Sequence, residues 1–179
     1  MAYDGVRAVN GLVQSFLVAG LLSVLPLTSA GAAAEESDAG LTGLFVHYYT
    51  ALEKGRWAEA FDFLHDRLKA ASEVKTPEDL ARRNTKTQQD LIEAFQTFDR
   101  IEVAKTTIDL TSIKARVMSS GDENVAGEVI YDLVVFPKGK GQPLMYRVVM
   151  DIGLAKGQII RMTQQSMTRI DPGGMGESA

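Results

Sequence analysis

Aspartate and tyrosine side chains in the C-terminal half of the chain are the residues best suited to chemistry. A carboxylate base beside a hydroxyl donor can move a proton and stabilise the negative charge that results. The carboxylate candidates are Asp132 and Asp151, and the hydroxyl candidates are Tyr131 and Tyr146. All four lie in segments typical of β-strands, so the face on which each one lies decides whether they can act together.

Side-chain alternation along the strands predicts those faces. Asp132 falls on the face opposite Tyr131. Asp151 shares a face with Arg147, opposite the apolar face that contains Val148. This second pattern is the cleaner one, so we expect Arg147 and Asp151 to point to solvent or to another subunit and to form cross-strand surface ion pairs. A functional polar site at Asp132 or Asp151 is the alternative.

Three further residues are candidates for binding a ligand. Asn84 and Thr87 interrupt the apolar stripe of a predicted helix. They would either line the mouth of a cavity and orient a ligand there, or lie in solvent where the helix projects past the sheet. Tyr48, on the apolar face of the first predicted helix, is the third candidate.

The chain lacks the residues that several other kinds of chemistry require. The chain has no cysteine, which excludes disulfides, thiolate zinc sites and a lipid-modified cysteine. The two histidines, His47 and His65, have no third ligand at metal-binding spacing, so we expect neither a metal nor a cofactor. The sequence contains no motif for a nucleophile elbow, a P-loop or a dinucleotide-binding loop. A net charge of −4 over 179 residues gives no reason to expect nucleic-acid binding.

Three helices are predicted to position the candidates. Apolar residues at helical spacing span residues 41–52, and a second stripe over residues 57–68 predicts one continuous helix after a tight turn at a glycine. The third helix is expected over residues 76–98. Thr76 can cap its start, and Pro77 suits its first position.

After residue 99, β-branched residues separated by turn signals predict strands. Residues 101–119 form either two strands or one bent strand, and three further strands are expected over residues 125–136, 144–154 and 158–168. Lys156-Gly157 reads as a hairpin turn between the last two. Short connections imply antiparallel neighbours, so we predict an α+β fold of three N-terminal helices packed on a curved antiparallel sheet of four to five strands.

The apolar segment at residues 12–27 is typical of a signal peptide. It is shorter than the roughly 20 residues that cross a hydrocarbon core, and Ala30 and Ala34 end two possible cleavage sites. We expect a signal peptide at 1–34, a flexible lead-in at 35–40, the domain at 41–170 and a disordered tail at 171–179. The product would be periplasmic or secreted, with no membrane attachment after cleavage. An uncleaved membrane anchor is the alternative.

The segment FVHYYTALEKGRWAEAFDFL, residues 45–64, resembles the opening of nuclear transport factor 2-like domains, the cone-shaped superfamily that includes ketosteroid isomerase and SnoaL-like cyclases. The residues that carry the resemblance are Tyr48, Tyr49, Ala51, Leu52, Gly55, Ala60, Phe61 and Leu64. Many members place a strand or hairpin after the second helix, where this chain has room only at residues 70–75. The element order is also similar to the periplasmic domain of a type IV secretion assembly factor that keeps a membrane anchor.

This resemblance implies a cone-shaped domain and leaves three hypotheses. The preferred one is an exported, non-catalytic binding or assembly module whose partner is a small apolar ligand or an envelope protein. The second is a small isomerase or cyclase that uses Asp132 or Asp151 as its base, and the third is a membrane-anchored subunit of an envelope complex. We also expect a homodimer formed through the sheet face, because members of the superfamily commonly dimerise there.

Overall fold

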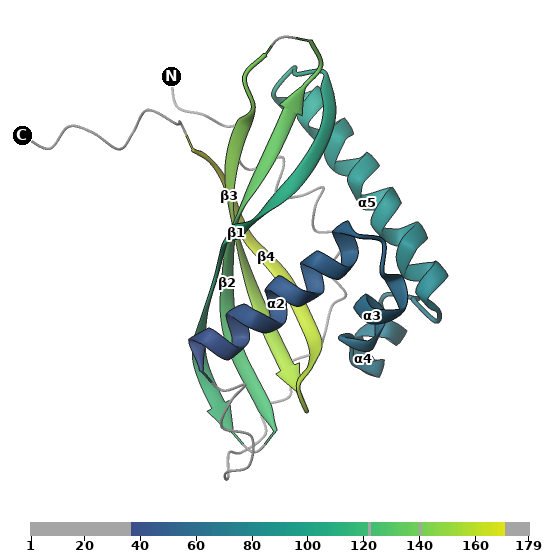
Figure 1. Cartoon of the computed structure of the whole chain (residues 1–179), viewed down its shortest axis with the longest axis vertical. Coiled ribbons are helices and arrows are strands. Elements are labelled where there is room, and N and C mark those ends of the chain that lie inside the picture. The colour runs from purple at the N-terminus through teal and green to yellow at the C-terminus, as the bar shows by residue number, and fades with distance from the viewer. Residues whose placement is uncertain (1–36, 122, 140, 171–179) are drawn as a thin grey trace, which may run out of the picture.

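The computed structural model describes residues 37–121, 123–139 and 141–170. Within these ranges, helices lie N-terminal to a four-stranded antiparallel sheet, which confirms the predicted α+β class (Figure 1). The expected signal peptide and tail lie outside the described residues. The strands follow one another across the sheet in chain order and are β1 (Val103–Gly121), β2 (Asn124–Pro137), β3 (Leu144–Ala155) and β4 (Gln158–Ile170).

Helix α2 (Asp38–Glu53) begins three residues before the predicted start, inside the expected lead-in. Ser37 causes this extension, because its Oγ accepts a hydrogen bond from the backbone N–H of Gly40 at 3.0 Å and so caps the first turn. The helix ends where its glycine signal predicts, since Gly55 adopts a left-handed φ of 66°.

The predicted second helix is wrong in one respect: it is two short helices. They are α3 (Trp57–Asp62) and α4 (Asp66–Ala71). Leu64 lies between them and forms a parallel bridge with Ile159 of β4, supported by hydrogen bonds from Ile159 N to Phe63 O at 2.8 Å and from His65 N to Ile159 O at 3.0 Å. Backbone groups that bond to a strand cannot also bond within a helix, so the helix breaks there.

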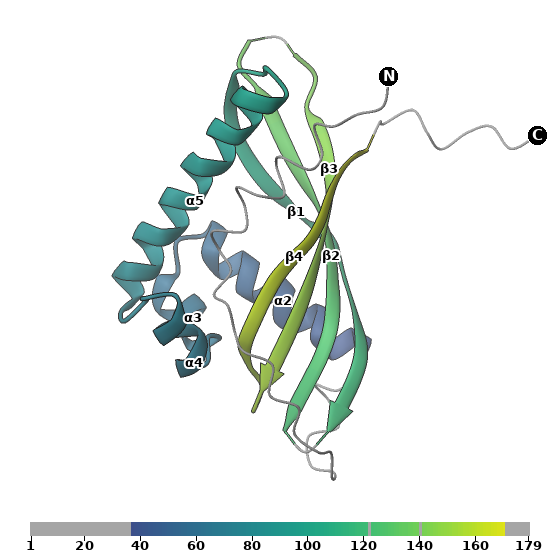
Figure 2. The same cartoon turned by 180° about the vertical axis from the view of Figure 1, so that it is seen from behind.

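Helix α5 (Pro77–Phe98) begins as predicted and crosses the open side of the sheet (Figure 2). Its first turn is a capping box: Thr76 Oγ1 accepts from the backbone N–H of Asp79 at 3.2 Å, and Asp79 Oδ2 accepts from that of Thr76 at 2.9 Å. These bonds satisfy N–H groups that a helix start leaves unpaired, which sets where α5 begins.

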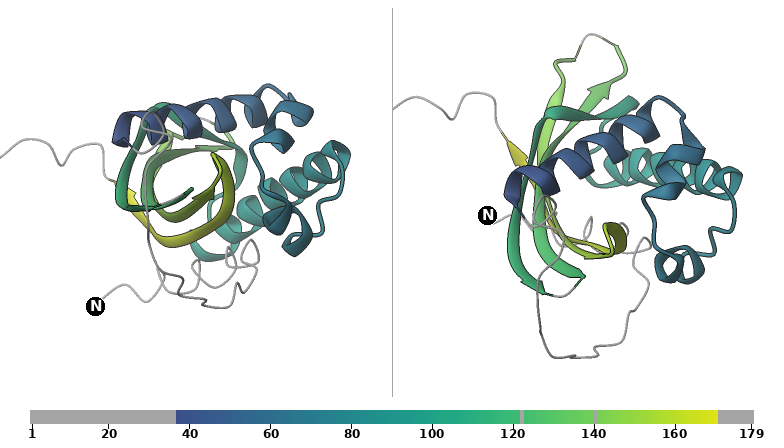
Figure 3. Two further views of the ribbon diagram at one scale, coloured as in Figure 1. Left: turned by 90° about the horizontal axis from the view of Figure 1, so that it is seen from below. Right: turned by 60° about the horizontal axis from the view of Figure 1, so that its bottom comes forward.

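Strand β1 is the single bent strand that was one of two alternatives. Asp109 pairs with Asp132 and Lys114 with Ile130, so β1 carries more residues than β2 between these two pairs. The bulged segment is held by Ser112, whose Oγ accepts a hydrogen bond from the backbone N–H of Asp132 at 2.7 Å. Bulges increase bending and twist, which contributes to the strong curl of the sheet seen end-on in Figure 3.

Helix α2 closes the outer edge of β1. Thr42 Oγ1 accepts a hydrogen bond from Ala115 N at 3.0 Å, and Asp38 Oδ1 accepts one from Val117 N at 2.7 Å. These side chains satisfy strand N–H groups that would otherwise be free at a sheet edge. The apolar face of α2 packs on the concave face of the sheet, where Leu41 and Phe45 are fully buried.

Candidate functional site

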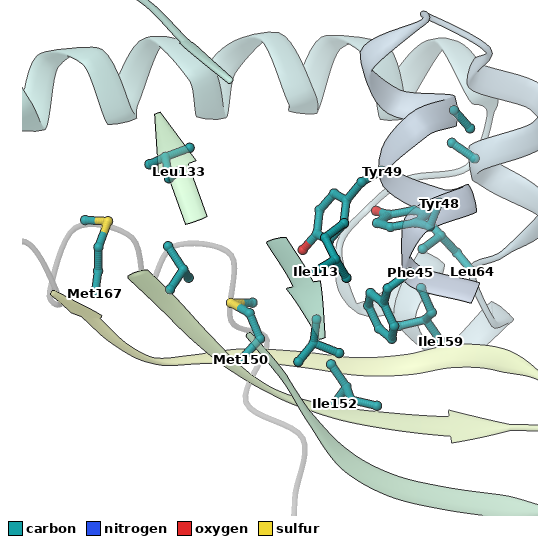
Figure 4. Packing of buried hydrophobic residues seen from close by; sticks show 14 of the residues in the cluster. Phe45, Tyr48, Tyr49, Leu64, Ile113, Leu133, Met150, Ile152, Ile159 and Met167 are labelled. Carbon is teal, nitrogen blue, oxygen red and sulfur yellow. The ribbon is translucent and has the colours of Figure 1, made fainter. Parts of the chain in front are cut away.

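A cavity of about 1280 Å³ lies between the concave face of the sheet, the C-terminal half of α2 and one side of α5. Its wall is mostly apolar and aromatic. In Figure 4 the side chains of Tyr48 and Tyr49 project from α2 toward the space bounded by Leu133 and Met150. The apolar and aromatic lining includes Tyr48, Tyr49, Leu52, Trp57, Leu64, Leu68, Val74, Leu80, Leu91, Tyr131, Leu133, Val148, Met150, Met162 and Met167.

Three tyrosines form one connected group in this wall. The ring centroids of Tyr48 and Tyr49 are 5.3 Å apart, and those of Tyr49 and Tyr131 are 5.2 Å apart. The hydroxyls of Tyr49 and Tyr131 also influence each other's pKa. Tyr131, on β2, therefore faces the cavity and α2, on the face opposite Asp132.

Burial keeps these three hydroxyls neutral. It raises the pKa of Tyr131 from 10.0 to about 12, with an opposing effect from the neighbouring Tyr49 hydroxyl. Burial also raises the pKa of Tyr48 and that of Tyr49, and for both the neighbouring Tyr131 adds to the increase. At neutral pH the hydroxyls can donate and accept hydrogen bonds, but they do not act as anionic bases.

The predicted ligand-binding residues Asn84, Thr87 and Tyr48 all line this cavity. Asn84 and Thr87 lie on the side of α5 that faces it. The Thr87 hydroxyl donates to the backbone carbonyl of Arg83 at 3.0 Å, which leaves its oxygen lone pairs for a ligand donor. Next to them, Gln88 Oε1 accepts a hydrogen bond from the Thr106 hydroxyl at 2.5 Å and ties α5 to β1.

The charged side chains that line the cavity are engaged or exposed. Lys86 Nζ pairs with Asp90 at 3.0 Å. Asp109 Oδ1 accepts hydrogen bonds from the backbone N–H and the hydroxyl of Thr111, at 3.0 and 2.6 Å. Arg83 Nη1 donates to the backbone carbonyl of Ser72, and Glu53 is exposed to solvent. The cavity is therefore polar at its margin and apolar inside.

Asp132 and Asp151 lie on the opposite, convex face of the sheet. Asp132 is directly across from Arg147, whose Nε and Nη2 lie 3.1 and 3.3 Å from its carboxylate oxygens. Asp132 raises the pKa of the Arg147 guanidinium through this hydrogen bond and its charge. Asp151 accepts a hydrogen bond from Gln165 Nε2 at 2.6 Å. The predicted cross-strand ion pair is confirmed for Arg147, and neither carboxylate is among the residues that line the cavity.

Tyr146, the other hydroxyl candidate, serves a structural contact. Its hydroxyl donates to Asp99 Oδ2 at 3.1 Å, and its ring lies 4.8 Å from that of Phe95. Burial, followed by the charge of Asp99, raises the pKa of Tyr146. The contact fastens the C-terminal end of α5 to β3.

The cavity residues that were not among the sequence candidates include Gln164 and three methionines, Met150, Met162 and Met167. In the sequence, the two methionines of this strand, Met162 and Met167, lie five residues apart and so fall on opposite strand parities, which is the signature of a β-bulge between them. A shift in the pairing of β3 with β4 between Val149 and Met150 shows that bulge. The change of parity is the signal that could have located Gln164.

Neither histidine is among the residues that line the cavity. His65 Nδ1 accepts a hydrogen bond from the backbone N–H of Arg67 at 3.1 Å and caps α4, while His47 is exposed. Across the described ranges, no cluster of three or more His, Cys, Asp or Glu residues could hold a metal ion. Among the helices described, none is both long and apolar enough to span a membrane.

Comparison of the chain with protein-family models, with curated proteins and with solved structures gives no match. The resemblance to nuclear transport factor 2-like domains therefore stays a prediction.

Proposed function

We propose that this protein is an exported binding module that holds a small, mostly apolar molecule in its cavity. The observation that carries the proposal is the cavity of about 1280 Å³ bounded by tyrosines, methionines and aliphatic side chains. Ligand sites are typically concave, mostly apolar and roughly 300–1,000 Å³ in volume, with a few polar groups that orient the ligand. This cavity has room for such a molecule, and Asn84 and Thr87 supply polar groups on one wall.

The arrangement of acidic groups favours binding over catalysis. Proton transfer requires a base within hydrogen-bonding reach of the bound molecule. Asp132 and Asp151 lie on the other face of the sheet, and the Asp109 carboxylate already accepts a hydrogen bond from the Thr111 hydroxyl. The buried tyrosines keep their protons at neutral pH. An isomerase or cyclase based on Asp132 or Asp151 consequently has less support than a binding module.

Export and cleavage are part of the proposal and rest on the sequence. The apolar segment at residues 12–27 and the small residues up to Ala34 support a signal peptide. Intact mass of the protein recovered from its native host tests this, and loss of residues 1–34 is the expected result. Full-length protein in the membrane fraction would favour the anchored envelope subunit instead.

Titration with N-phenyl-1-naphthylamine, an apolar dye whose fluorescence rises in apolar surroundings, tests the binding function. We expect saturable binding by the wild-type protein. Thr87→Trp places a large ring in the cavity and should lower the affinity for the dye by at least about tenfold. Gln89→Trp, on the exposed side of the same helix, is the matched control and should leave the affinity unchanged. Absence of saturable binding, or equal effects of the two substitutions, would contradict the proposal.

A further inference from the structure

The side-chain amide nitrogen of Gln164, on β4, is buried and has no hydrogen-bond partner among the described residues. Its Nε2 is enclosed, yet no described residue accepts a hydrogen bond from it. A buried N–H without an acceptor costs free energy, and native structures keep few of them. Gln164 also lines the cavity, so a rotation of its side chain would present Nε2 to an acceptor on an occupant of the cavity.

A β-bulge turns this residue inward. Ser166 pairs with Val149 and Gln164 pairs with Met150, so Gln165 is an extra residue on β4. Without the bulge, alternation from the buried Met167 would place Gln165 on the concave face. With it, Gln164 shares the face of Met150, and Gln165 points to the convex face, where its amide reaches Asp151.

The surroundings of Gln164 favour a neutral ligand group. Met150, Met162 and Met167 line the same part of the wall. Thioether side chains are flexible and polarizable, so they adapt to apolar ligands of varied shape. The cationic side chains of the lining are already engaged, Arg83 by the Ser72 carbonyl and Lys86 by Asp90. A neutral oxygen acceptor fits this environment better than a carboxylate, which would need a free cation.

We propose that Gln164 Nε2 donates a hydrogen bond to a neutral acceptor oxygen of the cavity ligand. This inference rests on the proposed function and specifies it: the ligand is an uncharged apolar molecule with a carbonyl or similar oxygen on its body. Occupation of the cavity then completes the hydrogen bonding of Gln164, and a ligand without the oxygen leaves the buried N–H unpaired.

Two probes of similar shape test the inference. 2-Acetylnaphthalene has a carbonyl oxygen and 2-ethylnaphthalene has none, and each competes with N-phenyl-1-naphthylamine for the cavity. In Gln164→Met we expect the affinity for 2-acetylnaphthalene to fall by about five- to tenfold, the value of one hydrogen bond. The affinity for 2-ethylnaphthalene should stay the same or rise, because the cost of the unpaired amide is removed.

Gln165→Met is the matched control, since it changes the adjacent glutamine on the other face of the sheet, and both probes should bind it as they bind the wild type. Binding of 2-ethylnaphthalene to Gln164→Met shows that this variant is folded. Equal changes for the two probes, or no change for either, would overturn the inference while leaving the binding function in place. Failure of the wild-type protein to bind the dye would instead overturn the proposed function and the inference with it.

A measurement on the wild-type protein does not depend on any substitution. The side-chain amide protons of Gln164 should shift downfield in a nitrogen–proton correlation spectrum when 2-acetylnaphthalene is added. Addition of 2-ethylnaphthalene should not produce this downfield shift. The same response to both probes would show that Gln164 does not bind the oxygen.

Discussion

Tyr49 of α2 and Tyr131 of β2 meet at the cavity wall, with ring centroids 5.2 Å apart and an interplanar angle of 58°. The pair joins the helical layer to the sheet at the same place where it borders the cavity. It therefore links the stability of the fold to the protonation of tyrosine.

Alkaline pH should destabilise the protein. Burial raises the pKa of Tyr48, Tyr49 and Tyr146 above 10.0 and that of Tyr131 to about 12. Below pH 10 these hydroxyls are protonated in both states; above it the unfolded chain loses protons that the folded protein keeps, so the free energy of unfolding falls. For Tyr131 the loss runs from pH 10 to about pH 12. Each such tyrosine contributes a slope of about −1.4 kcal/mol per pH unit.

Urea unfolding at several pH values from 8 to 11 measures this slope. Tyr131→Phe removes one titrating group and should make the alkaline slope shallower. A free energy of unfolding that does not change between pH 9 and pH 11 would show that these tyrosines are already solvated in the folded protein.

Gly127→Ala should destabilise the domain. An added Cβ would lie 2.6 Å from the backbone oxygen of Arg116 and 2.9 Å from Leu41 Cδ2, so strand and helix would have to move apart. We expect a loss of about 1–3 kcal/mol in the free energy of unfolding, typical of an overpacked core. Gly43→Ala is the control, because a Cβ at Gly43 of α2 meets nothing within 4 Å and should stabilise the helix by about 0.5–1 kcal/mol. Equal effects of the two substitutions would contradict this packing.

Loss of the cap on α5 should lower stability without affecting the cavity. Thr76→Ala removes the hydroxyl that accepts from Asp79 N, and we expect a cost of about 1 kcal/mol in chemical unfolding. Thr85→Ala, on an exposed position of the same helix, should change stability by less than about 0.5 kcal/mol. A Thr76→Ala protein as stable as the wild type would mean that the capping box contributes nothing.

Neutralising the convex-face carboxylates should leave ligand binding intact. Asp132→Asn and Asp151→Asn alter residues on the side of the sheet away from the cavity. We expect the affinity for N-phenyl-1-naphthylamine to change by less than about twofold. The Asp132–Arg147 pair should contribute at most about 1 kcal/mol to stability, since the Arg147 side chain is 52% exposed. A tenfold loss of affinity in either variant would restore that carboxylate as a site residue.

Self-association through the convex face stays a prediction that sedimentation can test. Ile130 and Val149 are paired across β2 and β3 on this face. We expect a dimer in analytical ultracentrifugation and a shift toward monomer in Val149→Lys, which would place a charge in the interface. Gln89→Lys on α5 is the control. Only monomer at high protein concentration would contradict the expected homodimer.

Local signals predicted much of the architecture. The start of α5 follows from Thr76, Pro77 and Asp79, which are neighbours in the chain, and the hairpin at Lys156-Gly157 follows from two residues that both adopt positive φ. Strand parity also placed Arg147 on its correct face and Tyr131 on the face opposite Asp132. These features depend on hydrogen bonds and periodicities that span only a few residues, so the sequence displays them directly.

Two decisive features depend on contacts between distant segments. Leu64 breaks a helical pattern because its neighbours bond to Ile159 of β4, and a bulge against β3 turns Gln164 rather than Gln165 toward the cavity. The sequence by itself determined the α+β class, the starts of α3 and α5 and the apolar faces of the helices. The tertiary structure decided that Asn84, Thr87, Tyr48 and Gln164 line one cavity and that Asp132 and Asp151 do not, because pairing register and sheet curvature are set by partners far along the chain.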